Sequence, residues 1–161
     1  MRFLVFLLAI LGMVNMHAKV VLPSLFTDNM VLQQQTDVQL WGVASPKKMV
    51  TICPSWDKKL YTVRADDAGM WRASLKTPVA GGPYSISLSD GEDLMLRDVL
   101  IGEVWLCAGQ SNMEMPLMGK ANQPIADAVD MIVRAKPSRP IRICTIGQEG
   151  ARMPQKNCRA Q

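Results

Sequence analysis

A serine between two short polar side chains is the group most suited to chemistry in this sequence. Residues 106–116 read LCAGQSNMEMP, in which Gly109 ends an apolar run and Gln110, Ser111 and Asn112 follow. A serine just after a strand can present its oxygen to a carbonyl, while nearby backbone N–H groups stabilise the developing oxyanion. Gln110 and Asn112 add side chains that could orient a substrate. A plainer interpretation is that Ser111 caps a helix, and the short Gly-x-Ser pattern alone does not exclude it.

A nucleophilic serine needs a base, which is usually a histidine. His17 is the single histidine of the sequence, and it lies in residues 1–18, where an arginine precedes an apolar run that leads to the small residue Ala18. This pattern is typical of a secretory signal peptide. The run is shorter than the roughly 20 residues of a membrane-spanning helix, so we expect cleavage near Ala18, a periplasmic or secreted product and no stable membrane anchor. The base for Ser111 then has to come from outside the mature chain.

The cysteines do not suggest a metal site. None of the four forms a CxxC pair, and residues 19–161 contain no histidine, so we expect neither zinc nor another cofactor. In an oxidising compartment three disulfide pairings are possible, and spacing does not choose among them. One cysteine lies in the apolar run before Gly109, where a buried, unreactive thiol is expected. The cysteines are Cys53, Cys107, Cys144 and Cys158.

Composition places the chain among globular proteins. It has 161 residues, of which 48% are hydrophobic and 20% charged, enough for one ordinary domain or a small domain with part of another. The formal net charge of +4 arises from 18 basic and 14 acidic residues that are spread along the sequence. Because no basic stripe with interleaved aromatic residues is present, we expect no nucleic-acid partner. The sequence does not indicate an oligomeric state.

Residues 19–98 have the pattern of a β-domain. Apolar residues alternate in the segments DVQLWG, KMVTIC, KLYTVR, PYSISLS and DLMLRD. Turn residues separate these segments, and Asp90-Gly91 is the strongest hairpin signal. Short strands at this spacing predict an antiparallel β-sandwich. We expect Trp41, Trp71 and Tyr84 to fill its core, although exposed aromatic residues could instead bind sugar rings.

Residues 99–161 have a different pattern. The run from 99 to 108 is apolar on both alternation phases, as in a strand buried on both faces. An apolar stripe at helical spacing predicts a helix that begins near Asn122 or Gln123 and ends before Pro137, and PIRICTI at 140–146 predicts another strand. Together these elements form a βαβ unit of a parallel sheet. Alone it leaves a face and an edge uncovered, so we expect the start of a larger, incomplete α/β domain; packing as an appendage on the β-sandwich is the alternative.

Several longer stretches resemble one protein family. They are LPSLFTDNMVLQQ, WGVASP, AGGPY, DVLIGEVWLCAGQSNMEMP, PIADA and PQKNC, which together run from about Val21 to Cys158. In these stretches the chain is similar to the bacterial sialate O-acetylesterases, serine esterases of the SGNH-hydrolase superfamily. The block around GEVWLCAGQSNMEMP is specific, whereas GQSN alone also resembles acetylxylan esterases.

The resemblance implies a β-sandwich beside an α/β/α domain of the SGNH type that hydrolyses O-acetyl esters on sialic acids without a metal. It implies that Ser111 is the nucleophile and that its N–H contributes to the oxyanion hole. The family carries its Asp-x-x-His pair further along the chain, and this sequence ends before it, so we expect an N-terminal part that is inactive alone. The alternatives are an acetylxylan-type esterase or a non-catalytic, secreted glycan-binding β-sandwich that uses Trp41 or Trp56.

Overall fold

The computed structural model describes residues 19–135, 141–147, 150–153, 155 and 157–160, so the predicted signal peptide and His17 lie outside the described residues. In this part of the chain most regular structure is strand, with a single helix. The elements are β1 (Val31–Gln33), β2 (Asp37–Val43), β3 (Met49–Pro54), β4 (Tyr61–Arg64), β5 (Met70–Lys76), β6 (Gly81–Ser89), β7 (Asp93–Gly102) and α2 (Ala128–Arg134).

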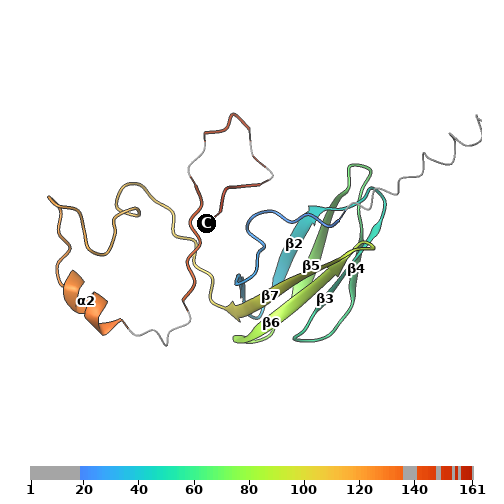
Figure 1. The fold of residues 1–161 in the computed structure, drawn as a ribbon, viewed down its shortest axis with the longest axis horizontal. Coiled ribbons are helices and arrows are strands. Elements are labelled where there is room, and N and C mark those ends of the chain that lie inside the picture. The colour runs from blue at the N-terminus through green and yellow to red at the C-terminus, as the bar shows by residue number, and fades with distance from the viewer. Residues whose placement is uncertain (1–18, 136–140, 148–149, 154, 156, 161) are drawn as a thin grey trace, which may run out of the picture.

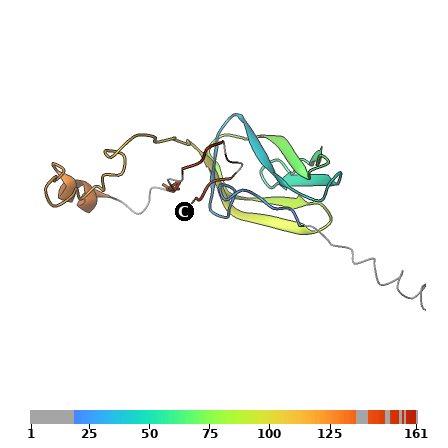
Figure 2. The ribbon, with the colours of Figure 1, turned by 90° about the horizontal axis from the view of Figure 1, so that it is seen from above.

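The strands form two sheets that enclose one core (Figures 1 and 2). The larger sheet has the order β1-β7-β6-β3-β4, and β2 pairs only with β5. The prediction of a strand-rich domain is confirmed, but the prediction that all its strands are antiparallel is wrong. β1 runs parallel to β7, with Val31 opposite Leu100. The reason is that β6 occupies only one edge of β7, and the short β1 reaches the other edge in the same direction as β7.

Alternation along the strands builds the core. The fully buried side chains come from inward positions of both sheets, as the period of two requires. They include Leu40, Val50, Ile52, Leu75, Ile86, Leu88 and Val99, each 0% exposed. Burial of such side chains is the main favourable contribution to folding.

The three aromatic residues expected in the core have different positions. Trp71 is buried with 3% exposure, as predicted, and Tyr84 packs partly buried against the core. The prediction for Trp41 is wrong, because its β2 neighbours Leu40 and Gly42 are the buried ones and alternation turns Trp41 to the outer face.

The predicted hairpin at Asp90-Gly91 is confirmed. It joins β6 to β7, with Ser89 opposite Asp93, and Gly91 has a φ of 125°, which glycine adopts without strain. The Asp90 carboxylate is buried and accepts hydrogen bonds from the N–H and the hydroxyl of Ser45, at 3.2 and 3.3 Å. The turn is therefore fixed to the loop that follows β2.

β7 continues through the predicted domain boundary. It passes Asp98, whose φ is 54°, and ends at Gly102, so that Val99 and Ile101 complete the core of the β-domain. The division into residues 19–98 and 99–161 stays a prediction, but the sheet includes the first residues of the second segment.

The predicted strand does not extend to residue 108. Residues 103–109 have no regular structure and are exposed, with Trp105 82% and Leu106 86% exposed. The prediction of a buried thiol at Cys107 is also wrong, since this side chain is exposed. The physical reason is the same for both: no strand among the described residues pairs with this segment, so nothing there covers its side chains.

The helix is shorter than its apolar stripe predicts. α2 begins at Ala128, after Asp127 in a left-handed conformation, rather than near Asn122 or Gln123. Only Ala128 of α2 is buried, and Val133 is 78% exposed. A helix of 7 residues depends on tertiary packing, which its apolar side chains do not find among the described residues.

The predicted strand at 140–146 is not observed. Among its described residues, only Ile146 takes part in pairing, through an isolated bridge to Ala160. A βαβ unit is therefore not formed in the described part of the chain. No described helix is both long and apolar enough to cross a membrane.

The end of the chain returns to the β-domain (Figures 1 and 2). Arg142 forms an ion pair with Asp98 at 2.9 Å, and its guanidinium also donates to the carbonyls of Asp98 and Met30. Near the C-terminus, Asn157 Oδ1 accepts hydrogen bonds from the N–H and the hydroxyl of Ser24, both at 3.0 Å. The chain therefore leaves the β-domain after Gly102 and contacts it again at Arg142, beside the same strand.

Candidate active-site segment

Hydrogen bonds to the β-domain hold the start of the segment that carries Ser111. Just after β7, the Glu103 carboxylate accepts hydrogen bonds from the side-chain amides of Gln34, at 2.6 Å, and Gln33, at 3.1 Å. The Gln33 carbonyl oxygen Oε1 accepts the N–H of Val104 at 2.8 Å. The hydrogen bonds from Gln34 and then Gln33 lower the pKa of Glu103 below its usual value, because they stabilise the carboxylate. Gln33 of β1 and Gln34, which follows it, thus hold the first two residues of the segment.

Ser111 lies in an exposed turn. The Met113 N–H donates to the Gln110 carbonyl at 2.9 Å, which brings the three predicted site residues Gln110, Ser111 and Asn112 onto one turn. No helix follows this turn directly, and among the described residues the Ser111 hydroxyl makes no hydrogen bond, so it caps no helix here. The hydroxyl is accessible to a substrate.

The same turn leaves backbone donors available. Within the part of the chain that is described, the N–H groups of Ser111 and Asn112 donate no hydrogen bond. Adjacent N–H groups of this kind can stabilise an oxyanion when they point at the reacting carbonyl oxygen. The segment therefore has a hydroxyl and candidate oxyanion donors within consecutive residues.

A base and a metal are not found beside them. The described residues contain no histidine, and they contain no group of three His, Cys, Asp or Glu side chains that could hold a metal ion. The four cysteines, all of them described, are free thiols. Ser111 thus has no activating partner in the described structure.

Exposed apolar side chains flank the turn on both sides. On the N-terminal side Val104 is 51% exposed, and the two residues after it are more exposed still. On the C-terminal side Met113 and Met118 are 53% and 64% exposed. Soluble proteins rarely expose a continuous stretch of this kind unless it binds something.

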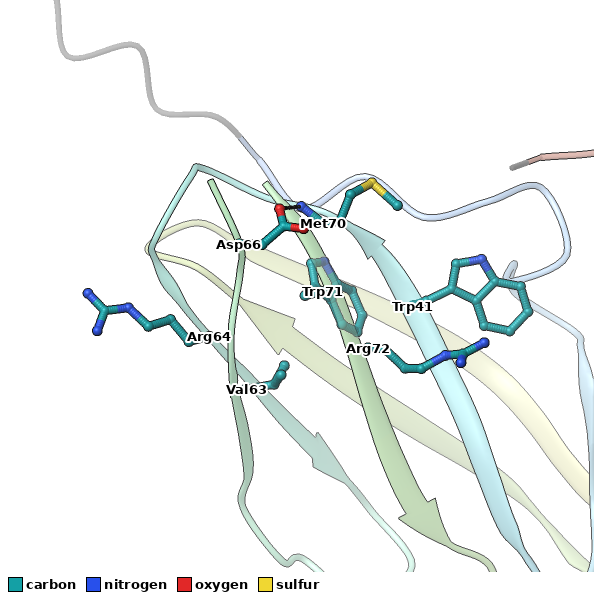
Figure 3. A pocket seen from close by; sticks show the side chains of 7 residues that line it. All are labelled: Trp41, Val63, Arg64, Asp66, Met70, Trp71 and Arg72. Carbon is teal, nitrogen blue, oxygen red and sulfur yellow. Dashed lines mark hydrogen bonds between the residues drawn. The ribbon is translucent and has the colours of Figure 1, made fainter. Parts of the chain in front are cut away.

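The described structure has a hollow elsewhere, on the β-domain (Figure 3). Its volume is about 440 Å³, and its lining comes from β2, β4, β5 and the turn before β5. The lining residues are Trp41, Val63, Arg64, Asp66, Met70, Trp71 and Arg72. Sequence reasoning noted Trp41 as a possible sugar-binding residue but missed Arg72. The signal was available, since Arg72 follows the buried Trp71 in an alternating segment and so had to face outward.

Comparison with solved structures identifies the class of protein that this fold resembles. A carbohydrate acetylesterase from Xanthomonas citri matches with a TM-score of 0.70 and 32% sequence identity, over 88% of this chain and 32% of that chain. The chain is therefore similar to part of a carbohydrate acetylesterase.

Within this class, the relatives found by sequence similarity are sialate O-acetylesterases. The chain is 32% identical over 106 residues to the sialate O-acetylesterase of Homo sapiens, and 34% identical over 102 residues to that of Mus musculus. These alignments cover 59% and 56% of the chain but 20% and 19% of the relatives, so the chain spans about a fifth of their length. The predicted resemblance to sialate O-acetylesterases is confirmed. No family model matches the chain.

Proposed function

We propose that this chain supplies the β-domain and the nucleophile of a secreted carbohydrate esterase that removes O-acetyl groups from sialic acids. The observation that carries the proposal is the similarity to sialate O-acetylesterases, at 32–35% identity, of a chain whose GQSN turn follows the last strand of its sheet. The exposed Ser111 hydroxyl and its free neighbouring N–H groups support the assignment of the nucleophile.

In this mechanism Ser111 Oγ attacks the acetyl carbonyl carbon, and a base takes the hydroxyl proton. The N–H of Ser111 stabilises the tetrahedral oxyanion, and Gln110 and Asn112 orient the substrate. The intermediate collapses with loss of the sugar alkoxide, which receives the proton from the base. Water then attacks the acetyl-serine, so that acetate leaves and Ser111 is regenerated.

The base for Ser111 is the remaining group of this mechanism. Residues 19–161 contain no histidine, and we propose that the histidine comes from an α/β segment outside this sequence. The exposed apolar residues beside Ser111 support this proposal, because they offer a surface for such a segment to cover. We therefore expect the 161-residue chain to release no acetate on its own.

The test is a chimera. Residues 19–161 replace the matching part of the Xanthomonas citri acetylesterase, which is 32% identical to this chain, and acetate release from O-acetylated N-acetylneuraminic acid is measured. We expect the chimera to turn over and the isolated chain not to do so. Ser111→Ala in the chimera is expected to lower kcat by roughly 10³-fold or more, since loss of a nucleophile removes the covalent route.

The matched control is Ser74→Ala, at an exposed position on β5, which is expected to leave kcat within twofold. A Ser111→Ala chimera with full activity would refute the nucleophile, and turnover by the isolated chain would refute the need for an added histidine. Acetylated xylan assayed in parallel tests the substrate, since a chimera that prefers it would favour the acetylxylan-type alternative.

A further inference from the structure

The hollow on the β-domain lies where two sheets approach without pairing. β4 belongs to the five-stranded sheet and β5 to the two-stranded one, and the hollow of about 440 Å³ opens between them. The buried ring of Trp71 forms part of the lining, and Trp41 and Arg72 stand on the outer face of β2 and β5 (Figure 3). None of these residues belongs to the Ser111 segment.

Trp41 and Arg72 form a fixed pair. They are directly opposite each other in the β2–β5 ladder, and the Arg72 guanidinium carbon lies 5.9 Å from the centre of the Trp41 ring. Phe26 packs edge-on against the indole, with ring centres 4.6 Å apart and an interplanar angle of 79°. The indole is thus held in place, and little side-chain freedom remains to be lost on binding.

The Arg72 guanidinium is available to a ligand. Among the described residues it forms no ion pair and no hydrogen bond, although it has five N–H donors that suit a carboxylate. Two other charged groups of the lining form hydrogen bonds with the backbone. Asp66 Oδ1 accepts the N–H groups of Ala68 and Met70, at 2.9 and 2.8 Å, and Arg64 donates its Nε to a backbone carbonyl and points away from Trp41 (Figure 3).

We propose that this hollow binds a sugar that carries a carboxylate, with the pyranose ring against Trp41 and the carboxylate paired with Arg72. A rigid indole offers a flat apolar surface to the C–H face of a sugar ring, and a guanidinium binds a carboxylate through two parallel hydrogen bonds. The hollow is a separate site from Ser111. Of the two tryptophans expected to bind glycans, Trp56 is committed to the fold, since its Nε1 donates to the Lys76 carbonyl at 3.1 Å and its ring packs against Tyr84.

The experiment titrates the full chain with the methyl α-glycoside of N-acetylneuraminic acid and follows its indole N–H signals by NMR. The sequence has four tryptophans, and we expect saturable shifts for Trp41 and Trp71 but not for Trp56 and Trp105. Arg72→Gln is expected to raise the Kd at least tenfold. The matched control is Arg97→Gln, at an exposed position on β7 and outside the hollow, with a Kd within twofold.

Two further ligands separate the parts of the proposal. The methyl ester of the same sugar, which has no charge, is expected to bind at least tenfold more weakly, and acetate at the same concentration is expected to shift neither indole. Equal affinity for the ester would refute the role of Arg72, and equal shifts with acetate would refute the role of the sugar ring.

Trp41→Leu tests the aromatic surface, with the dispersion of the amide spectrum as the check on folding. If folded Trp41→Leu or Arg72→Gln protein keeps the original affinity, the hollow is not the site. Failure of this binding experiment would leave the Ser111 proposal standing, because no ester is cleaved in it.

Discussion

The Thr77 hydroxyl ties the end of β5 to the loop between β1 and β2. Thr77 is 3% exposed, and its Oγ1 accepts the Thr36 N–H at 3.1 Å. The hydroxyl proton can be donated to the carbonyl of Gln33, at 2.7 Å, or to that of Thr36, at 2.9 Å. Thr77→Val keeps the shape of the side chain and removes both the acceptor and the donor.

The cost of Thr77→Val follows from these hydrogen bonds. Each is worth roughly 1 kcal/mol net, and leaving a partner unsatisfied raises the loss toward the upper end of a range of about 1–3 kcal/mol. We therefore expect Thr77→Val to lower the free energy of unfolding by about 2–4 kcal/mol. Thr77→Ser keeps the hydroxyl and loses one methyl group, at a cost of about 1 kcal/mol.

Urea denaturation followed by tryptophan fluorescence measures both variants, with Thr62→Val, at an exposed position on β4, as the matched control. The control is expected to remain within about 0.5 kcal/mol of the parent. Because Thr77 binds the Gln33 backbone carbonyl and the side-chain Oε1 of the same residue accepts the Val104 N–H, Thr77→Val is expected to speed amide exchange at Val104. A Thr77→Val protein as stable as the parent, or more stable than Thr77→Ser, would refute the reasoning.

Three other perturbations test the packing, the ionisation and the return of the chain. Gly42→Ala would place its Cβ 2.4 Å from the Val21 carbonyl oxygen and 3.0 Å from the Trp71 ring, so we expect a loss of about 1–3 kcal/mol in the same urea assay, and a neutral result would contradict the tight packing. Partial burial, and then the hydrogen bond to Asp57, raise the pKa of Tyr61 above 10.0, so the folded state favours the protonated phenol. The resulting stabilisation of the folded state is complete below about pH 10 and is lost as the pH rises through the folded pKa. Asp57→Asn should lower the Tyr61 pKa in an alkaline ultraviolet titration, and an unchanged value would exclude the Asp57 contribution. Arg142→Gln removes the ion pair with Asp98 and is expected to change global stability by less than about 1 kcal/mol. It is also expected to speed amide exchange at Gly147, whose N–H donates to the Arg159 carbonyl at 2.8 Å, and unchanged exchange there would show that Arg142 does not hold the segment.

Local pattern was sufficient for much of the β-domain. Strict alternation predicted β2, β3, β4, β6 and the first part of β7, and the Asp90-Gly91 turn followed from its chemistry. β5 was not predicted, although Trp71, Ala73 and Leu75 alternate along it. β1 has only 3 residues, too few to show a period, and pairing with β7 decides its structure.

Periodicity failed where burial depends on distant partners. An apolar run indicates that a segment favours burial, but it does not identify what buries it. Residues 99–102 belong to β7 and contribute Val99 and Ile101 to the β-domain core. Residues 103–109 are exposed, pair with no strand among the described residues and adopt no regular structure. The same reason applies to the α2 stripe, of which Ala128 is buried and Val129 is 64% exposed. The outward position of Trp41 follows from the alternation of Val38 and Leu40 in the same segment, a signal that the sequence contains.

The β-domain therefore holds the segment that carries Ser111 at both of its ends. Glu103 is fixed to β1 at one end of the excursion, and Arg142 is fixed to Asp98 of β7 at the other. Holding both ends against the β-domain limits the positions that the Ser111 turn can explore, which would lower the conformational entropy lost on binding of the proposed second segment. Burial of Trp105 and Leu106 would then favour that association by about 25 cal/mol for each Å² of apolar surface removed from water. The proposed histidine-bearing segment would thus also cover the exposed apolar residues beside Ser111.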